Sequence, residues 1–387
     1  MRFIPLKYNL RNLVVRRTST LLTVFGIGVS VAVFVATMAL VEGIKQTFVT
    51  TGDPLNVLAI RDGAQSETGS IIEPGPALTA RTLPGIAAAP DGRPLVSLER
   101  MVYVNHDRIG SGSSNVAMRG LDTFGRELRP AARLAAGRWY TPGRREITVS
   151  RTIASRFRDC ALGDELVTGK VRWTVVGIFD AGHSAYASEI WTSADDIASA
   201  FHRNVYSDVL MRAADPDTER ALIEQMANDP RMRLDARSEP AFYTTQTQTA
   251  TPIRIVGNVI AVIMAVGSAF AAMNTMYAAV ASRGREVAVL RALGFSRRAI
   301  AASFVSEALL LAVVGGVVGG LGVIPLNGLT TGTTNWLSFS EMTFHFAVTP
   351  ALIARGIAFA AFMGLAGGIL PALRASRLSP AQAMRAL

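Results

Sequence analysis

The sequence is poor in the residues that build disulfides and metal centres. One cysteine, Cys160, cannot form an internal disulfide, and it excludes the thiolate cages that hold structural zinc. No HExxH pattern occurs, and the four histidines are scattered at His106, His183, His202 and His345. We interpret Cys160 as a buried, unreactive thiol, and we expect no bound metal.

Motifs of nucleotide binding and hydrolysis are also missing. There is no GxxxxGK[ST] phosphate loop, so ATP binding in the P-loop manner is excluded. No GxSxG nucleophile elbow occurs, and His183 beside Ser184 is interpreted as part of a surface loop rather than a catalytic pair. The sequence therefore predicts a protein that is not an enzyme and holds no cofactor of its own.

Long apolar runs are what the sequence does have. Apolar residues make up 50% of the chain, and the mean hydropathy is +0.31. Four runs reach the roughly 20 residues that cross a bilayer, and we place them at 21–42, 253–280, 303–326 and 348–373. The first run follows twenty residues that include five basic ones, which favours an uncleaved anchor over a signal peptide.

The net charge of +10 is unevenly placed. Residues 43–250 carry 24 Lys/Arg and 25 Asp/Glu, whereas the rest of the chain carries 15 and 4. Of those 15 basic residues, 13 lie in the segments 2–17, 283–298 and 374–385, and the short loop 327–347 has none. This distribution follows the positive-inside rule. We therefore expect a multi-pass protein of the bacterial cell (inner) membrane with both termini in the cytoplasm. It argues against nucleic-acid binding, which needs a continuous basic surface.

Residues 1–20 place Leu6, Leu10, Leu13 and Val14 at helical spacing among basic residues. This pattern predicts an amphipathic helix on the cytoplasmic leaflet. Its role is either electrostatic anchoring or contact with a partner. Residues 374–387 are expected to form a basic cytoplasmic tail.

The segment 43–252 is predicted to be an α+β domain outside the cytoplasm. Each of its ends reads as a strand–helix–strand unit, which implies one lobe built from 50–120 and 205–240. A strand-rich insert, 121–204, lies between them, with a short helix starting at Ser193. The predicted strands are 56–61, 94–105, 146–150, 164–168, 172–180, 207–212 and 231–237, and the predicted helices are 78–88 and 217–229.

The loop 281–302 connects the second and third apolar runs. It carries five arginines against one acid, Glu286, and it intersperses them with Val287, Val289, Leu290 and Leu293 before a glycine at 294. This pattern predicts a short cytoplasmic helix with an apolar face that ends at the glycine. Such a face needs a protein partner.

Polar and small residues stand out inside the apolar runs. We interpret Asn274 as making an interhelical hydrogen bond or lying on a substrate path, and Glu307 as snorkelling or pairing with a basic residue of the loop. Two small-xxx-small pairs predict close packing within the bundle or between protomers: Gly315 with Gly319, and Gly316 with Gly320.

Several segments resemble one family. The stretch MNTMYAAVASRGREVAVLRALGFSRRAIAASFVSEALLLAVVGGVVGG (273–320) closely resembles the MacB/FtsX-type ABC transporter permeases, and the tail LPALRASRLSPAQAMRAL (370–387) resembles the way they end. RWTVVGIFD and GRWYTPGRREITVS resemble the family's extracytoplasmic domain, and RNLVVRRTSTLLTVFGIGVSVAV resembles its beginning.

The resemblance implies a four-helix permease that dimerises and is driven by an ATPase, which holds ATP and magnesium. Since the sequence has no fused amino-terminal ATPase of the MacB kind, we expect the ATPase to be a separate subunit. The family's coupling helix, carried over by position, corresponds to Arg285, Glu286, Leu290, Arg291, Leu293 and Gly294.

The resemblance implies mechanotransmission: ATP-driven movement reaches the extracytoplasmic domain for export or extraction of a substrate. A periplasmic membrane-fusion adaptor is a further partner that this reading allows. The alternative function is an FtsX-like signalling or scaffold subunit whose outer domain activates a cell-wall hydrolase.

Overall fold

The fold was analysed in a computed structural model, which describes residues 17–110, 112–247, 250–335 and 340–377. The described chain forms two compact units. One contains the described parts of Met1–Glu42, Pro252–Leu329 and Phe346–Leu387, and the other contains those of Gly43–Thr251 and Thr330–His345. The amphipathic helix predicted at 1–20 and the end of the tail fall largely outside the described residues.

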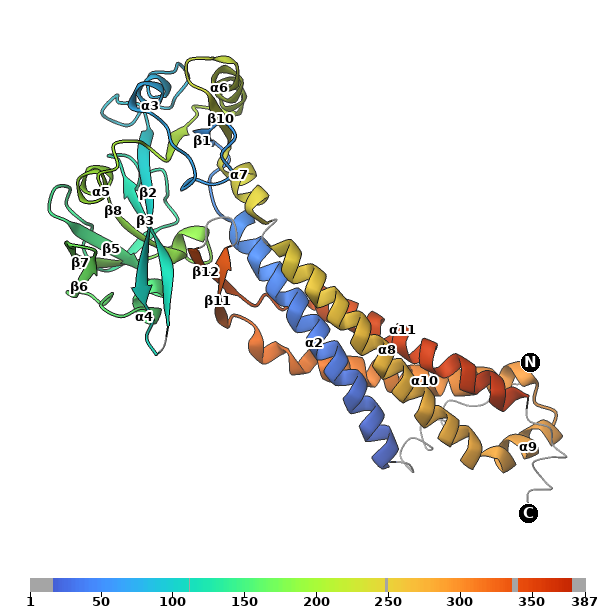
Figure 1. The fold of residues 1–387 in the computed structure, drawn as a ribbon. Helices are drawn as coiled ribbons and strands as arrows, with labels where there is room; N and C mark the ends of the chain where they lie inside the picture. Colours follow the sequence, from blue (N-terminus) through green and yellow to red (C-terminus); the bar gives the residue numbers. More distant parts are fainter. Residues whose placement is uncertain (1–16, 111, 248–249, 336–339, 378–387) are drawn as a thin grey trace. The chain divides into compact units, whose positions relative to one another are not determined.

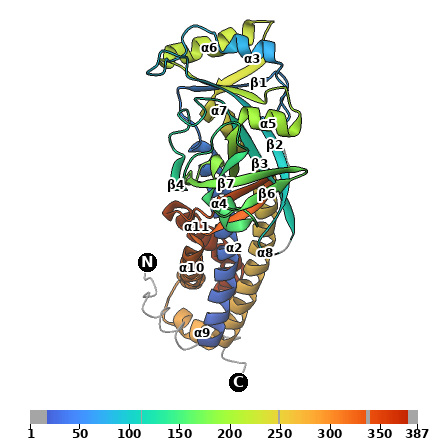
Figure 2. The same ribbon diagram turned by 90° about the vertical axis from the view of Figure 1, so that its left-hand side faces the viewer.

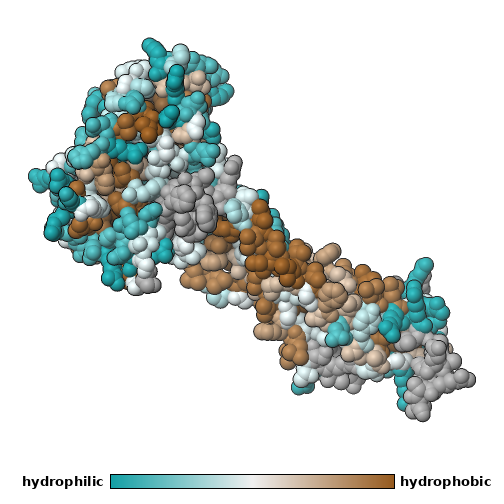
Figure 3. Space-filling view, in the orientation of Figure 1, coloured by the Kyte–Doolittle hydropathy of each residue, from teal (hydrophilic) through white to brown (hydrophobic). Residues whose placement is uncertain are grey.

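The first unit is a bundle of four helices, each long and apolar enough to cross a membrane (Figure 1). They are α2 (Arg17–Val49), α8 (Ala250–Ser282), α10 (Arg297–Gly322) and α11 (Pro350–Ser376). Their visible surface is mostly hydrophobic (Figure 3). A helix of 33 residues, such as α2 or α8, is about 50 Å long, whereas a bilayer core is about 30 Å thick. Both helices therefore extend beyond the predicted spans.

The second unit is built on one ten-stranded sheet in the order β10-β1-β9-β2-β3-β8-β5-β7-β4, with β6 paired to β7. Most neighbours are antiparallel, and β3–β8 and β5–β7 are parallel. The strands are β1 (Asn56–Arg61), β2 (Val96–Asp107), β3 (Ser113–Leu121), β4 (Arg133–Gly137), β5 (Glu146–Ser150), β6 (Glu165–Thr168), β7 (Val171–Asp180), β8 (Glu189–Ser193), β9 (Asp208–Arg212) and β10 (Leu234–Ser238).

Two hydrophobic cores divide this α/β domain. In the first, α3 (Pro74–Ala80) and α6 (Pro216–Asn228) pack beside β1, β9, β10 and the start of β2 (Figure 2). In the second, α4 (Arg151–Arg156) and α5 (Ala194–Phe201) pack with β3, β5, β6, β7, β8 and the end of β2. Strand β2 passes from one core to the other, since Leu98 belongs to the first and Val104 to the second. The second core therefore takes in residues of β2 and β3, which precede the predicted insert 121–204.

Several elements differ from the sequence-based prediction. The helix expected at 78–88 is α3, Pro74–Ala80, because Pro74 suits the first turn of a helix and a turn at Pro84 and Gly85 follows it. Gly85 has φ +93°, a value that ends regular structure. The strand expected at 231–237 starts only at Leu234, after a turn in which Met232 N–H donates to the Asp229 carbonyl.

The loop 327–347 contains a hairpin that the sequence did not predict, formed by β11 (Thr330–Asn335) and β12 (Ser340–His345). The hairpin belongs to the α/β unit: the Thr343 N–H donates to Ser188 Oγ at 2.9 Å. The end of α2 belongs to the same unit, where Phe48 lies 6.0 Å from Phe344 between ring centroids. Both the first membrane helix and the connection between the last two thus continue into the α/β domain.

Helix α7 (Glu239–Gln246) precedes α8 and is fixed at its first residue. Glu239 is fully buried and accepts hydrogen bonds from the Asp53 N–H, from Asn56 Nδ2 at 2.8 Å and from the Tyr186 hydroxyl. Its carboxylate therefore ties the entry of the domain to its exit, because Asp53 follows α2 and Glu239 leads towards α8.

Candidate functional site

The connection between α8 and α10 is a short helix, α9 (Gly284–Ala292), as the arginine-rich loop predicted. Its end is a Schellman motif: Phe295 N–H donates to the Leu290 carbonyl and Gly294 N–H to the Arg291 carbonyl, both at 3.1 Å. Gly294 has φ +88°, which a side chain would oppose. Ser296 then caps α10, since its hydroxyl accepts from the Ala299 N–H. The sequence thus fixes both ends of the turn.

One face of α9 is anchored in the bundle. Val287 is 2% exposed and belongs to a cluster with Met276 of α8, Ile300 and Phe304 of α10, and Ala372 of α11. This cluster packs α9 against the ends of three membrane helices.

A buried ion pair adds a second anchor. Arg283, just before α9, donates from Nη1 to Glu307 Oε2 at 2.6 Å, and both side chains are 6% exposed. The guanidinium also lies 5.9 Å from the Phe304 ring centroid. Removing one partner would leave an uncompensated buried charge, which makes this pair far more costly to break than a surface pair. The sequence left two possibilities for Glu307, snorkelling or pairing with a basic residue of the loop. The structure shows the pairing, with Arg283.

The opposite face of α9 is open. Of the six residues proposed for coupling, Arg285, Glu286, Leu293 and Gly294 are exposed, whereas Leu290 and Arg291 are half-buried. Arg291 donates from Nη1 to the Phe295 carbonyl at 3.3 Å, so it supports the turn as well. Val289, which was not among the six, is 54% exposed on this face.

The spacing 285, 286, 289, 293 could have identified Val289 from sequence, because these positions share one side of a helix. The open face combines charge with two exposed apolar side chains, Val289 and Leu293. This face is therefore accessible to a protein partner, whereas the other face is packed against the bundle.

The four glycines singled out in α10 contact two different helices. Gly315 and Gly319 face α2: a Cβ at Gly315 would lie 3.0 Å from Ile27 Cβ, and one at Gly319 would overlap the carbonyl of Gly28. Gly316 and Gly320 face α11, where Cβ atoms would meet Ala360, Ile357 and Ile353. In this structure both small-residue pairs serve packing within one chain.

Asn274 lies on an exposed part of α8, and its side chain makes no hydrogen bond within the described part of the chain. The polar contacts between α2 and α8 come instead from hydroxyls. Ser30 and Ser268 lie 2.5 Å apart between oxygens, and Thr23 Oγ1 donates to Thr275 Oγ1 at 3.3 Å. No interhelical bond of Asn274 is present among these residues.

The α/β domain holds a buried charge network that the sequence did not reveal. Arg119 of β3 is fully buried and donates to Glu67, to Glu99 of β2 and to both oxygens of Glu189 of β8, at 2.7 to 2.9 Å. Arg129 donates to both oxygens of Glu99 at 2.6 and 2.8 Å. The network links strands of both cores, so it fixes one lobe of the domain to the other.

Burial and neighbouring charges change the pKa values of two carboxyl groups in this network, Glu99 and Asp208. Burial alone would raise the pKa of Glu99, but the charges of Arg129 and Arg119 outweigh it and lower that pKa. Burial raises the pKa of Asp208 well above its usual value, and the neighbouring charges of Glu99 and Glu67 add to the rise. The Arg119 guanidinium, 3.6 Å from Asp208, opposes that rise.

Comparison with protein-family models matches both parts of the chain. Residues 20–229 match the MacB-like periplasmic core domain, and residues 258–380 match the FtsX-like permease C-terminal region. Because the first match covers more than half of the chain, the chain belongs to the MacB-like family of ABC transporter permeases. This confirms the predicted fold class: four membrane helices, with an α/β extracytoplasmic domain between the first and the second.

Individual relatives extend over nearly the whole chain. The macrolide export ATP-binding/permease protein MacB 1/2 of Paracoccus denitrificans is 27% identical over 390 residues, which cover 94% of this chain and 56% of that protein. The pyoverdine export ATP-binding/permease protein PvdT of Pseudomonas putida is 25% identical over 393 residues, with 96% and 58% covered. The chain thus spans a little over half the length of these relatives.

Among solved structures, the periplasmic region of MacB from Actinobacillus actinomycetemcomitans matches 50% of this chain and 93% of its own, with 11% identity and a TM-score of 0.38.

Proposed function

We propose that this chain is a permease subunit that passes an ATP-driven conformational change from a cytoplasmic ATPase to its extracytoplasmic domain, for export or extraction of a substrate. The observation that carries the proposal is the two-sided α9, with Val287 buried among the ends of three membrane helices and Val289 and Leu293 exposed on the other side.

The path of the movement follows from the contacts of α9. A push on the open face reaches α10 through the Arg283–Glu307 pair, and it reaches α8 and α11 through the cluster around Val287. Breaking that pair would cost several kcal/mol, so α9 and α10 move together. At the other end, the last turns of α2 and the β11–β12 hairpin belong to the α/β unit. We propose that the movement passes to the domain through these covalent connections.

The partners follow from the same proposal. The 387 residues contain no phosphate loop, so ATP and magnesium are bound by an ATPase component that docks on α9. The basic segments support a position of α9 on the cytoplasmic side of the inner membrane. We further propose that two permease copies form a homodimer and that a periplasmic adaptor joins the assembly where the system exports its substrate. The names of the relatives favour export.

The proposal is tested by charge changes on the open face of α9. Glu286→Lys and Val289→Asp alter exposed side chains, but Glu286 Oε2 also lies 4.0 Å from Arg283 Nε. Val289→Asp is therefore the variant that is expected to fold and insert normally. Each is predicted to lower stimulation of the partner's ATPase by the reconstituted permease about ten-fold or more, because a charge buried in an interface without a partner costs about 2–5 kcal/mol. Val289 is a cleaner position than half-buried Leu290, where an aspartate would also disturb the bundle.

Ile109→Asp is the matched control, since Ile109 is 61% exposed and lies in the α/β domain. It is expected to leave ATPase stimulation unchanged. Full stimulation in both α9 variants would show that the ATPase docks elsewhere. Intact coupling to a cell-wall hydrolase, with no transported substrate, would favour the FtsX-like alternative.

A further inference from the structure

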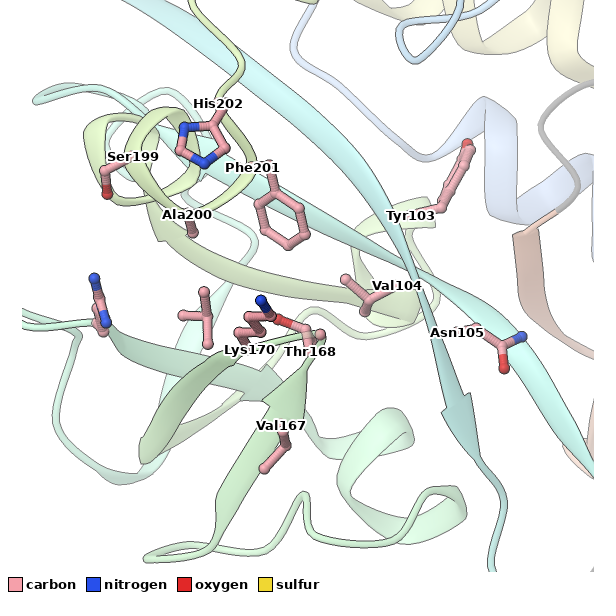
Figure 4. A pocket seen from close by; sticks show the side chains of 13 residues that line it. Tyr103, Val104, Asn105, Val167, Thr168, Lys170, Ser199, Ala200, Phe201 and His202 are labelled. Carbon is pink, nitrogen blue, oxygen red and sulfur yellow. The ribbon is translucent and has the colours of Figure 1, made fainter.

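The second core of the α/β domain is bordered by a cavity of about 730 Å³ that the coupling mechanism does not use (Figure 4). This volume lies within the roughly 300–1,000 Å³ of ligand-binding clefts. It is formed by the middle of β2, the tip of the β6–β7 hairpin, the end of α5 and the residue before β5. Its lining residues are Tyr103, Val104, Asn105, Arg145, Val167, Thr168, Gly169, Lys170, Val171, Ser199, Ala200, Phe201 and His202.

Strand β2 borders the cavity with a free edge. Its first residues, Val96–Glu99, pair with β9, but from Arg100 to Asp107 its only strand partner in the described chain is β3, on the other side. On the β9 side, the Met101 N–H donates a hydrogen bond to a side-chain oxygen, Ser207 Oγ, at 2.9 Å. At the far end of this stretch Arg108 forms an isolated antiparallel bridge with Phe157, so the open part of the edge lies between Met101 and Asp107.

The alternation of a strand shows which backbone groups face this gap. Met101 directs its N–H away from β3, and Asp107 accepts there from the Arg158 N–H at 3.0 Å. Residues two apart along a strand point their N–H and C=O groups the same way, so Tyr103 and Asn105 face the same side. Neither has a backbone hydrogen bond on that side in the described chain. In Figure 4 their side chains point away from the hairpin, whereas Val104 points towards it.

The rest of the lining combines buried apolar side chains with exposed basic ones. Val104 is 4% exposed, and Phe201 is half-buried against the second core. Arg145 and Lys170 are both exposed, and His202 closes the end of α5; none of the thirteen lining residues is acidic. Arg145 and His202 also adopt left-handed backbone angles, φ +52° and +51°, which side chains rarely take and which cluster at binding sites.

We propose that this cavity binds an extended, acidic segment of a partner protein, which adds to the free edge of β2 as a further strand. An unpaired strand edge offers main-chain hydrogen bonds to such a segment, and pockets for alternate side chains give it selectivity. Alternate side chains on the hairpin side of the added strand would face Val104, Phe201 and Lys170, so a carboxylate among them would meet the cation. The proposal is independent of how the ATPase docks.

The test measures binding of labelled hexapeptides to the purified full-length chain in detergent, by fluorescence anisotropy. The first peptide alternates glutamate and valine. The second replaces glutamate by lysine, and the third keeps glutamate but carries N-methyl groups on alternate backbone nitrogens, which removes its donors along one edge. Saturable binding is expected for the first peptide and not for the other two.

The protein side is tested with Arg145→Glu combined with Lys170→Glu, and with Arg144→Glu as the matched control, because Arg144 is an exposed neighbour outside the lining. The double variant is expected to raise the Kd for the glutamate peptide about ten-fold or more, and the control to change it by less than about two-fold. Three results would overturn the proposal: no saturable binding of the glutamate peptide to the unaltered chain, equal binding by the double variant, or equal binding of the N-methylated peptide. The last would point to anion binding without strand addition.

Discussion

At the scale of single residues, the structure depends on charges placed where water cannot reach them. Arg119, Arg129 and Glu99 are buried in the α/β domain, and Arg283 and Glu307 at one end of the bundle. Buried ions persist only when partners compensate their desolvation, and here each one has a carboxylate or guanidinium at 2.6 to 2.9 Å. Since both lobes supply members of the first network, it holds the domain in one arrangement.

Arg119→Met tests that role. It removes a guanidinium that four acids surround, so the expected loss is about 3–5 kcal/mol in the free energy of unfolding. Thermal unfolding of the full chain in detergent, followed by tryptophan fluorescence, measures it, because Trp191 donates to Glu189 within the network. Arg220→Met is the control: its ion pair with Asp217 is exposed, and its loss should change stability by about 0.5 kcal/mol or less. Equal effects of the two substitutions would contradict the account.

Glu146 makes the stability of the domain depend on pH. The side-chain hydrogen bonds from Arg138 lower the pKa of Glu146 from 4.5 to about 2, although burial opposes the shift. A lowered folded-state pKa stabilises the fold above the usual value, and this contribution is lost as the pH falls from 4.5 towards 2. The stability difference between the unaltered chain and Glu146→Gln is therefore expected to shrink over that window. Melting temperatures of both proteins at pH 7, 4 and 2.5 measure it, and a constant difference would argue against the ion pair.

At the scale of elements, glycine decides how closely helices approach and where they end. Gly294 allows α9 to end in a left-handed residue, and the glycines of α10 let α2 and α11 come close enough for backbone contact. Without a large hydrophobic force inside a bilayer, such close packing is what holds the bundle together.

Gly319→Ala is predicted to destabilise the bundle, since its methyl group would overlap the Gly28 backbone. Gly322→Ala is the matched control in the same helix, where an added Cβ meets nothing within 4 Å. Detergent-solubilised Gly319→Ala should unfold at a lower temperature than the unaltered chain, by several degrees, because overpacking costs about 1–3 kcal/mol. The control should not. Identical melting of both variants would mean that α2 and α10 do not pack through this surface.

At the scale of the whole molecule, the elements that produce a repeating pattern of apolar residues could be predicted from the sequence. The apolar runs predicted four membrane helices, and the strand signals located β1, β5, β6 and β7 closely. Burial alternates along β6 and β7, whereas β1 and β5 are buried along nearly their whole length. Strand β3 escaped prediction, since the apolar alternation in SSNVAMRGL is limited to Val116 and Met118 and is flanked by serines, an asparagine and a glycine. Hairpin β11–β12 escaped because its threonines carry no apolar period.

The candidate site was predictable in part for the same reasons. The glycine at 294 and the mixed charge of the loop indicated a short helix that ends at that glycine, but its exposed side follows from how Val287 packs, which the sequence alone does not specify. Long-range pairs such as Glu99 with Arg129 lack any local signal, because they depend on which strands become neighbours.

Docking of an ATPase on α9 is tested most directly by identifying the protein that contacts the open face of α9 in cells. A photo-reactive amino acid in place of Val289 is predicted to form a light-dependent covalent adduct with a polypeptide that carries a phosphate-binding loop, identified by mass spectrometry, while the same group in place of Ile109 gives none. An adduct from Val289 with an extracytoplasmic protein, or an ATPase adduct from Ile109 alone, would contradict the account.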